Sequence, residues 1–380
     1  MSTEKRFFQL VLLFLIGAMT VYTLLLRSAM YNEDGLPRLE SSALRVIGED
    51  AAGDFAAFRL LESSPADAYD SAVQTAYLRN KMQSRGTFAA FASPVKAFIA
   101  VPFMPLPYIG YFDTVFFWGF FLFGVALYAL FPLRISVLLL AALPAAFLNF
   151  AFGGFGLYVA ACAVLSLMLA ENCPKRAGFF GGLLAAEPLM FALVLFAFAF
   201  RKQKKALMTA ALVGGFLLIA AGMRYGFAAY GAAVSAAFQA LKAAPCRFVS
   251  PAGILLCGGA SPFVAILFQT VCVLYVFSIG YKLFFKYRFK SEAVQNAFLC
   301  AASVLLTPVA AAGDGALLSA AVAFLLYDSE RRGYLKADLP LFVLAFGAIF
   351  FDGVWAAKIG VSMQTVIAVL LPLACQRRAY

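Results

Sequence analysis

Long apolar runs separated by short polar segments dominate the chain. The first run covers residues 7–26, follows Lys5 and Arg6, and is long enough to cross a membrane as a helix. It is longer than the core of a signal peptide and lacks a small-residue cleavage site, so we expect an uncleaved anchor. The later runs predict further spans at residues 113–131, 135–150, 156–170, 177–186, 189–200, 206–222, 264–281, 296–309, 315–327, 339–351 and 354–373.

The composition indicates the same class of protein. Of the 380 residues, 64% are hydrophobic and 13% are charged, whereas soluble domains are about half apolar and about a quarter charged. A soluble fold has too little core to bury this much apolar surface. We therefore predict an all-α polytopic membrane protein with roughly ten to twelve transmembrane helices, forming a single integral membrane domain over residues 1–380.

The basic residues predict the orientation of the chain. They form short clusters between the apolar runs, and the positive-inside rule places these clusters, and both termini, in the cytoplasm. This placement accounts for the net charge of +11 without a nucleic-acid partner. The clusters are Lys175 and Arg176; Arg201, Lys202, Lys204 and Lys205; Lys282, Lys286, Arg288 and Lys290; Arg331, Arg332 and Lys336; and Arg377 and Arg378.

This orientation leaves a large loop, residues 27–112, on the outer side, followed by a helical bundle over residues 113–374. Residues 41–59 and 71–81 have the composition of amphipathic surface helices, and the proline-rich stretch after them suggests a re-entrant segment. Residues 177–200 are short for two full spans, so we also consider a re-entrant pair that is broken at Pro188.

The outer loop is rich in carboxylates. For most of them the ordinary interpretation is a solvated surface charge. Asp54 differs because Gly53 and Phe55 flank it close to the membrane face, where a carboxylate could remove a proton from an alcohol. Composition alone does not separate it from Glu49 or Asp50. Residues 27–96 hold nine of the nineteen acidic residues: Glu33, Asp34, Glu40, Glu49, Asp50, Asp54, Glu62, Asp67 and Asp70.

A series of short motifs follows one order along residues 40–380. They are Gly53-Asp54-Phe55 with Tyr69-Asp70, Phe91–Pro94, Pro102–Pro107 with Trp118, Asn149 with Gly153, Ala177–Leu183 ending at Glu187-Pro188, and Leu306-Thr307-Pro308 with Asp314. This series resembles glycosyltransferase family 87, membrane transferases with the C-type superfamily fold that use a polyprenyl-phosphate sugar. The chain departs from the family at Ser93, Gly154, Glu187 and Gly313, where the family has Tyr, Gln, Lys and Tyr.

The resemblance implies transfer of a sugar from a polyprenyl-phosphate donor to a hydroxyl of a lipid or glycan, on the periplasmic face of a bacterial inner membrane. The partners would be the donor lipid, membrane lipids and other membrane proteins, with no cofactor. The chain has no histidine, and its cysteines lack metal-ligand spacing, so we predict no metal site.

Such a transfer needs a base for the acceptor hydroxyl and positive charge for the departing phosphate. The resemblance points to Asp54 as the base and to Asp314 as a second catalytic carboxylate, although Asp314 also suits a helix N-terminal cap. Lys96, Arg224 and Lys358 are candidates for the phosphate, or else interfacial anchors. The motifs add Asp70, Asn149 and Glu187 as substrate-binding candidates.

Two alternatives remain open at this stage. The departures from the motifs favour a catalytically degenerate member that serves as a structural subunit of a membrane assembly. A lipid transporter would require internal repeats or charges inside several spans.

Cys246 and Cys257 share one outer loop, where they could form a disulfide.

Overall fold

The computed structural model describes residues 17, 21, 49–82, 91–131, 149, 153–286, 291–336, 338–347 and 362–379. Within these residues the regular elements are helices and there is no β-strand. This confirms the all-helical class. The predicted first span at 7–26 falls outside the described residues except at two positions, and most of the predicted span at 135–150 and the start of the last span also fall outside them.

Three of the described helices are long and apolar enough to cross a membrane: α5 (Tyr108–Leu130), α11 (Lys204–Tyr225) and α14 (Pro262–Tyr281, continued by the π-helical turn η4, Lys282–Lys286). All three were predicted as spans. Their outer faces carry large apolar side chains, such as Phe216 on α11 and Ile266 on α14. Side chains of this kind facing outward are expected where a helix meets lipid.

Shorter helices fill the interior between these three. α8 and α15 are buried along nearly their whole length, because their apolar residues face other helices on every side. The shorter helices are α8 (Gly156–Met168), α9 (Pro174–Leu183) with the 3₁₀ turn η2 (Leu184–Ala186), α10 (Pro188–Phe200), α15 (Glu292–Leu306), η5 (Ala312–Gly315), α16 (Ala316–Arg332), a helix over Asp338–Gly347, and α18 (Met363–Ala379).

The predicted break at Pro188 is confirmed, since η2 ends at Ala186 and α10 begins at Pro188. Proline fits the first turn of a helix because it lacks an N–H. Before the break, α9 packs closely on α11 through Gly178 and Gly182. A Cβ atom at Gly178 would lie 2.5 Å from the carbonyl oxygen of Ala206. Glycines four residues apart on one helix face allow such close contact between membrane helices.

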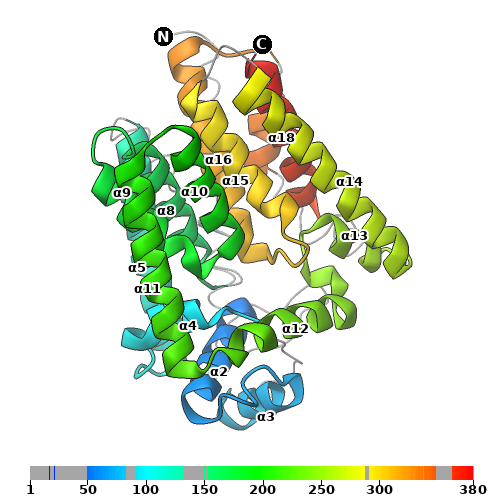
Figure 1. Ribbon diagram of the computed structural model, residues 1–380. Coiled ribbons are helices and arrows are strands. Elements are labelled where there is room, and N and C mark those ends of the chain that lie inside the picture. The colour runs from blue at the N-terminus through cyan, green and yellow to red at the C-terminus, as the bar shows by residue number, and fades with distance from the viewer. Residues whose placement is uncertain are drawn as a thin grey trace.

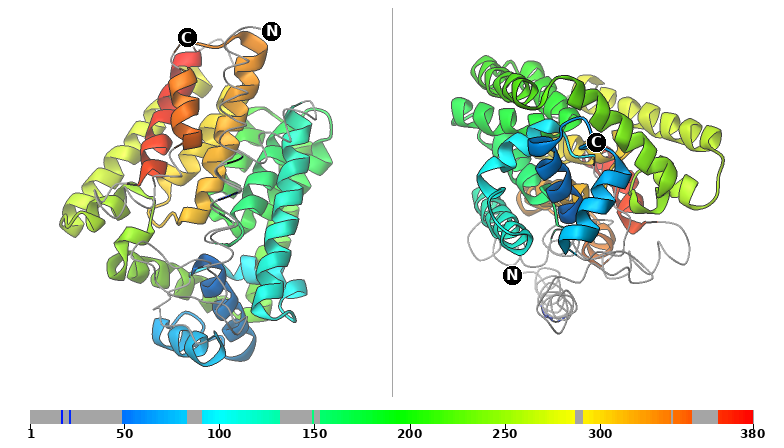
Figure 2. Two further views of the ribbon diagram at one scale, coloured as in Figure 1. Left: turned by 180° about the vertical axis from the view of Figure 1, so that it is seen from behind. Right: turned by 90° about the horizontal axis from the view of Figure 1, so that it is seen from below.

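A cap of helices covers one end of the bundle, and the view from below shows these helices lying across it (Figures 1 and 2). The cap comprises α2 (Glu49–Ser63), α3 (Ser71–Met82), α4 (Pro94–Ala100) with the 3₁₀ turn η1 (Val101–Phe103), and α12 (Ala228–Ala243); beside it lie η3 (Pro245–Arg247) and α13 (Pro251–Cys257).

The first cap helix differs from its prediction in its burial. Residues 41–48 lie outside the described part of the chain, and the described helix, Glu49–Ser63, is largely buried. Phe55 packs its ring against Tyr108 and Tyr111 of α5, at centroid distances of 5.6 and 5.2 Å. The alanines of α2 let the helix approach its neighbours, so it is an internal element instead of a surface helix. The second cap helix agrees with its prediction to within one residue.

α18 ends opposite the cap (Figure 1), and the last turns of α16 and α18 carry basic residues. There Arg378 is 3% exposed and pairs with Asp328 at 2.7 Å and with Asp338. Arg332 and Arg377 pair with the same two aspartates. These arginines belong to two of the predicted clusters, and their ion pairs tie α16 and α18 together.

Candidate functional site

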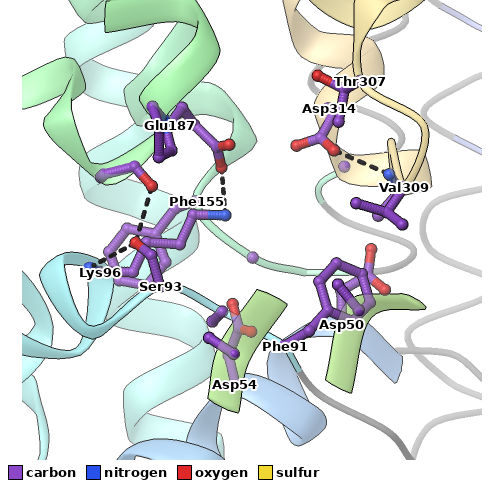
Figure 3. A pocket seen from close by; sticks show the side chains of 18 of the residues that line it. Asp50, Asp54, Phe91, Ser93, Lys96, Phe155, Glu187, Thr307, Val309 and Asp314 are labelled. Atoms are coloured by element: carbon purple, nitrogen blue, oxygen red, sulfur yellow. Dashed lines mark hydrogen bonds and ion pairs between the residues drawn. The ribbon is translucent and has the colours of Figure 1, made fainter. Parts of the chain in front are cut away.

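A cavity of about 480 Å³ lies between the cap and the bundle. Its walls come from α2, α4, α12, the segments that lead into α8 and α10, and residues 306–314. Figure 3 shows charged side chains from several of these elements pointing into it. The charged lining residues among the described part of the chain are Asp50, Asp54, Lys96, Glu187 and Asp314.

Asp54 enters the cavity from α2, below the other charged groups in the view (Figure 3). The pKa of its carboxyl is raised from 3.8 to about 7, chiefly because the charged form loses hydration on burial. Within this result the Lys96 ammonium lowers the pKa, and the carboxylates of Asp50, Glu187 and Asp314 raise it. Asp54 therefore exchanges its proton near neutral pH, as a general base does.

Lys96 forms an ion pair with Glu187, which links α4 to the start of α10 (Figure 3). The same two elements are joined by Ser93, whose hydroxyl donates to the carbonyl oxygen of Ala186 at 2.9 Å and accepts the backbone N–H of Lys96 at 3.3 Å. Burial alone would lower the pKa of Lys96, but the nearby carboxylates of Glu187, Asp314 and Asp54 raise it above its ordinary value. The lysine stays charged.

Asp314 enters the cavity from the opposite side, in the turn before α16 (Figure 3). Its carboxylate accepts the backbone N–H of Ala311 at 2.8 Å, which agrees with the predicted capping role. Burial raises the pKa of this carboxyl to about 7, the Glu187 carboxylate raises it further, and Lys96 and the Ala311 N–H lower it. Asp314 therefore both closes its own turn and faces the cavity.

A glycine segment before α8 lies against both α2 and the Asp314 turn. Asn149 holds it, accepting the backbone N–H of Leu157 at 3.3 Å. Gly154 has φ +91°, a conformation that side chains other than glycine rarely adopt. This backbone conformation favours glycine at position 154. At Gly156 a Cβ atom would lie 2.1 Å from the carbonyl oxygen of Gly313, so this wall and the Asp314 turn are in direct contact.

Helix N-termini also face the cavity. Its lining includes Gly156 at the start of α8 and Pro188 at the start of α10, and Asp314 lies just before α16. The N-terminus of a helix carries a partial positive charge and free N–H groups. These ends help to offset the excess of carboxylates over lysine in the cavity, and they favour an anionic group on a ligand.

Two predicted residues lie elsewhere, and a third is outside the described part of the chain. Arg224 forms an exposed ion pair with Glu62 at 2.9 Å, and it is outside the cavity lining. Asp70 accepts the backbone N–H groups of Ala72 and Val73 and so caps α3. Lys358 falls outside the described residues. The predicted substrate-binding roles of Arg224 and Asp70 therefore have no basis in the geometry of this cavity.

Sequence reasoning did not single out Asp50 or the α12 wall. Asp50 lies one helical turn before Asp54, so both carboxylates share one face of α2. On α12, Tyr230, Ala233 and Ala237 line the cavity at helical spacing. The i, i+4 spacing of Asp50 and Asp54 was available in the sequence, because the helix predicted over residues 41–59 contains both positions.

No protein-family model, curated protein or solved structure matches this chain.

Proposed function

We propose that the protein is a membrane glycosyltransferase that moves a sugar from a polyprenyl-phosphate donor to a hydroxyl of a lipid or glycan. One observation carries the proposal: motifs that are far apart in the sequence line one cavity. Asp54, Ser93 with Lys96, Gly153 with Gly154, Glu187 and Thr307 with Asp314 all contribute to its lining. In the sequence these positions follow the order of the family's motifs.

The chemistry follows from the charges in the cavity. Asp54 takes the proton of the acceptor hydroxyl while that oxygen forms a bond to the anomeric carbon of the sugar. The bond between the anomeric carbon and the phosphate oxygen breaks, and its electron pair leaves with the polyprenyl phosphate. Lys96 and the helix N-termini stabilise the negative charge of this leaving group. The apolar surface of α12 beside the cavity suits a polyprenyl chain.

The disulfide between Cys246 and Cys257 supports the proposed periplasmic location of the cavity. Disulfides persist in oxidising compartments such as the bacterial periplasm. The cytoplasm is reducing, and the basic clusters at the opposite end suit that side. In this proposal the cavity and the cap face the periplasm of a bacterial inner membrane, and the C-terminus lies in the cytoplasm.

The test is transfer of radiolabelled sugar from a panel of polyprenyl-phosphate sugars by purified protein in lipid nanodiscs. We expect transfer by the wild type and a loss of at least about a hundredfold in Asp54→Asn, which keeps the shape but cannot accept the proton. Asp70→Asn is the matched control, because Asp70 is exposed and lies away from the cavity. Full activity of Asp54→Asn would remove Asp54 as the base.

One observation favours a second candidate, the catalytically degenerate subunit. The Lys96 ammonium is already paired with Glu187, whereas a donor phosphate would need the lysine. The same assay separates the two candidates. Folded protein that retains a polyprenyl lipid but transfers sugar from no donor would favour the subunit.

A further inference from the structure

We propose that the disulfide-closed segment, Cys246–Cys257, positions the Asp314 wall of the cavity, so that opening the disulfide releases this wall and leaves the opposite walls in place. The Asp314 wall is defined here as residues 307–314. The inference concerns the geometry of the cavity and holds whichever reaction the cavity performs.

The backbone of the segment is bonded directly to the wall. The Val249 N–H donates to the carbonyl oxygen of Ala310 at 2.9 Å, and Phe248 pairs with Ala311 as an antiparallel bridge. The Ser250 hydroxyl donates to the carbonyl oxygen of Pro308 at 2.6 Å. Three consecutive residues of the segment therefore hold three positions of the wall.

This contact leads to the Asp314 carboxylate in one further step. Ala311, which pairs with Phe248, is also the residue whose N–H bonds to the Asp314 carboxylate at 2.8 Å. A shift of the segment thus moves the residue that orients the carboxylate. The carbonyl oxygen of Val249 accepts the hydroxyl of Thr365 on α18, so the segment also ties the wall to the bundle.

Side-chain packing ties the segment to two other parts of the cavity. Phe248 is buried with Ala240 and Leu241 of α12, and Val309 of the wall packs against the same group. The centroid of the Phe248 ring lies 5.6 Å from that of Phe91, which lines the cavity.

The disulfide closes the segment at its ends. Cys246 lies in η3, three residues after α12 ends at Ala243, and Cys257 is the last residue of α13. Without the covalent link, hydrogen bonds and packing alone hold residues 247–256 against the wall, and the ends of the segment gain conformational freedom. Cys246 is exposed, so a reductant can reach the bond.

The opposite walls are held by other contacts. Asp54 is carried by α2, which packs on α5 through Phe55. The Lys96–Glu187 pair is supported by the hydrogen bond from Ser93 to Ala186. Opening the disulfide is therefore expected to separate the behaviour of Asp314 from that of Asp54.

Hydrogen–deuterium exchange of the full-length protein in nanodiscs tests the proposal. In Cys246→Ser/Cys257→Ser, we expect peptides over residues 305–314 to exchange about tenfold faster than in the wild type. Peptides over 153–160 and 184–190 should change by less than about twofold. Cys173→Ser is the matched control, since Cys173 is a free and partly exposed cysteine.

Carbodiimide labelling of carboxyl groups reports how accessible the Asp314 carboxyl itself is. We expect faster labelling of Asp314 in the double variant and unchanged labelling of Asp54. If the double variant does not insert, the folded wild type is treated with TCEP, which reduces the disulfide to two thiols and becomes the phosphine oxide. Unchanged exchange at 305–314, or an equal increase in every wall, would overturn the proposal.

Discussion

At the scale of single residues, the cavity is defined by two carboxyl groups that titrate near neutral pH. Asp54 and Asp314 come from opposite sides, and burial raises the pKa of each to about 7. One lysine, Lys96, faces both and is already paired with Glu187. At pH 7 the cavity thus contains carboxyl groups that can either take up or release a proton, as acid–base chemistry on a hydroxyl requires.

These raised pKa values predict how stability depends on pH. The folded protein binds the Asp54 and Asp314 protons more tightly than the unfolded chain, whose carboxyls have an ordinary pKa of 3.8. The free energy of unfolding therefore falls as pH rises from about 4 to about 7. Melting curves of wild type and Asp54→Asn between pH 4 and 9 test this. As pH rises, the stability of the variant should fall less than that of the wild type.

The control for this prediction is Asp70→Asn, because Asp70 is exposed and caps α3. Its melting curves should follow those of the wild type through the pH range from 5 to 8. If the wild type became more stable between pH 4 and 7, the carboxyls of the cavity would not be the groups that dominate its pH dependence.

At the scale of elements, the site depends on segments that pass one another at backbone distance. The clearest case is the start of α8 against the Asp314 turn, where Gly156 faces the carbonyl oxygen of Gly313. The sequence shows glycines here, and their motif order suggested a turn. The identity of the facing segment could not be predicted, because it lies more than 150 residues away along the chain.

We predict that Gly156→Ala destabilises the protein by about 2–3 kcal/mol, since the new Cβ atom would meet a backbone oxygen that cannot move freely. Gly231→Ala on α12 is the matched control. Its Cβ atom would enter open space, and alanine favours a helix by about 0.5–1 kcal/mol over glycine. Thermal unfolding in one detergent measures both, and equal stability of the two variants would contradict the close contact.

The helix boundaries show what local pattern can and cannot determine. The break before α10 was predicted because residues 177–200 are short for two full spans and contain Pro188, both of which are local properties. The burial of α2 was not predicted. Its short run of alanines and phenylalanines suits either a surface or a core, and only the rings of α5 decide between them.

At the scale of the whole molecule, the two ends have opposite chemistry. The cap lies at one end and α18 ends at the other (Figure 1). Cap helices line the cavity and the disulfide lies beside them, whereas the buried ion pairs of Arg378 lie in the last turn of α18. Removing one partner from a buried ion pair leaves a charge without compensation, which costs more than the pair contributes.

Arg378→Met is therefore expected to destabilise the protein by about 3–5 kcal/mol, because Asp328 and Asp338 would each lose a buried partner. Arg377→Met is the control. Arg377 pairs with Asp338 at 3.0 Å but is itself half exposed, and Asp338 keeps its pair with Arg378, so the loss of Arg377 should cost about 1 kcal/mol or less. Thermal unfolding measures the stability of both variants. A small effect of Arg378→Met would show that water can replace its ion pairs with Asp328 and Asp338.

The sequence by itself determined the features that depend on local composition. The apolar runs specify helices and a membrane environment, the basic clusters mark one end, and Pro188 marks a helix break. Cys246 and Cys257 were predicted as a candidate pair because they share one loop, and the structure bridges them.

Only the tertiary structure decided which charges meet. Asp54, Lys96, Glu187 and Asp314 come from four elements spread over 260 residues, and packing brings them to one cavity. The same packing left Arg224 and Asp70 outside it. The physical reason is that hydrophobicity and turn chemistry act between neighbours in the chain, whereas the burial of a charge and its partners depend on segments that are distant in the sequence.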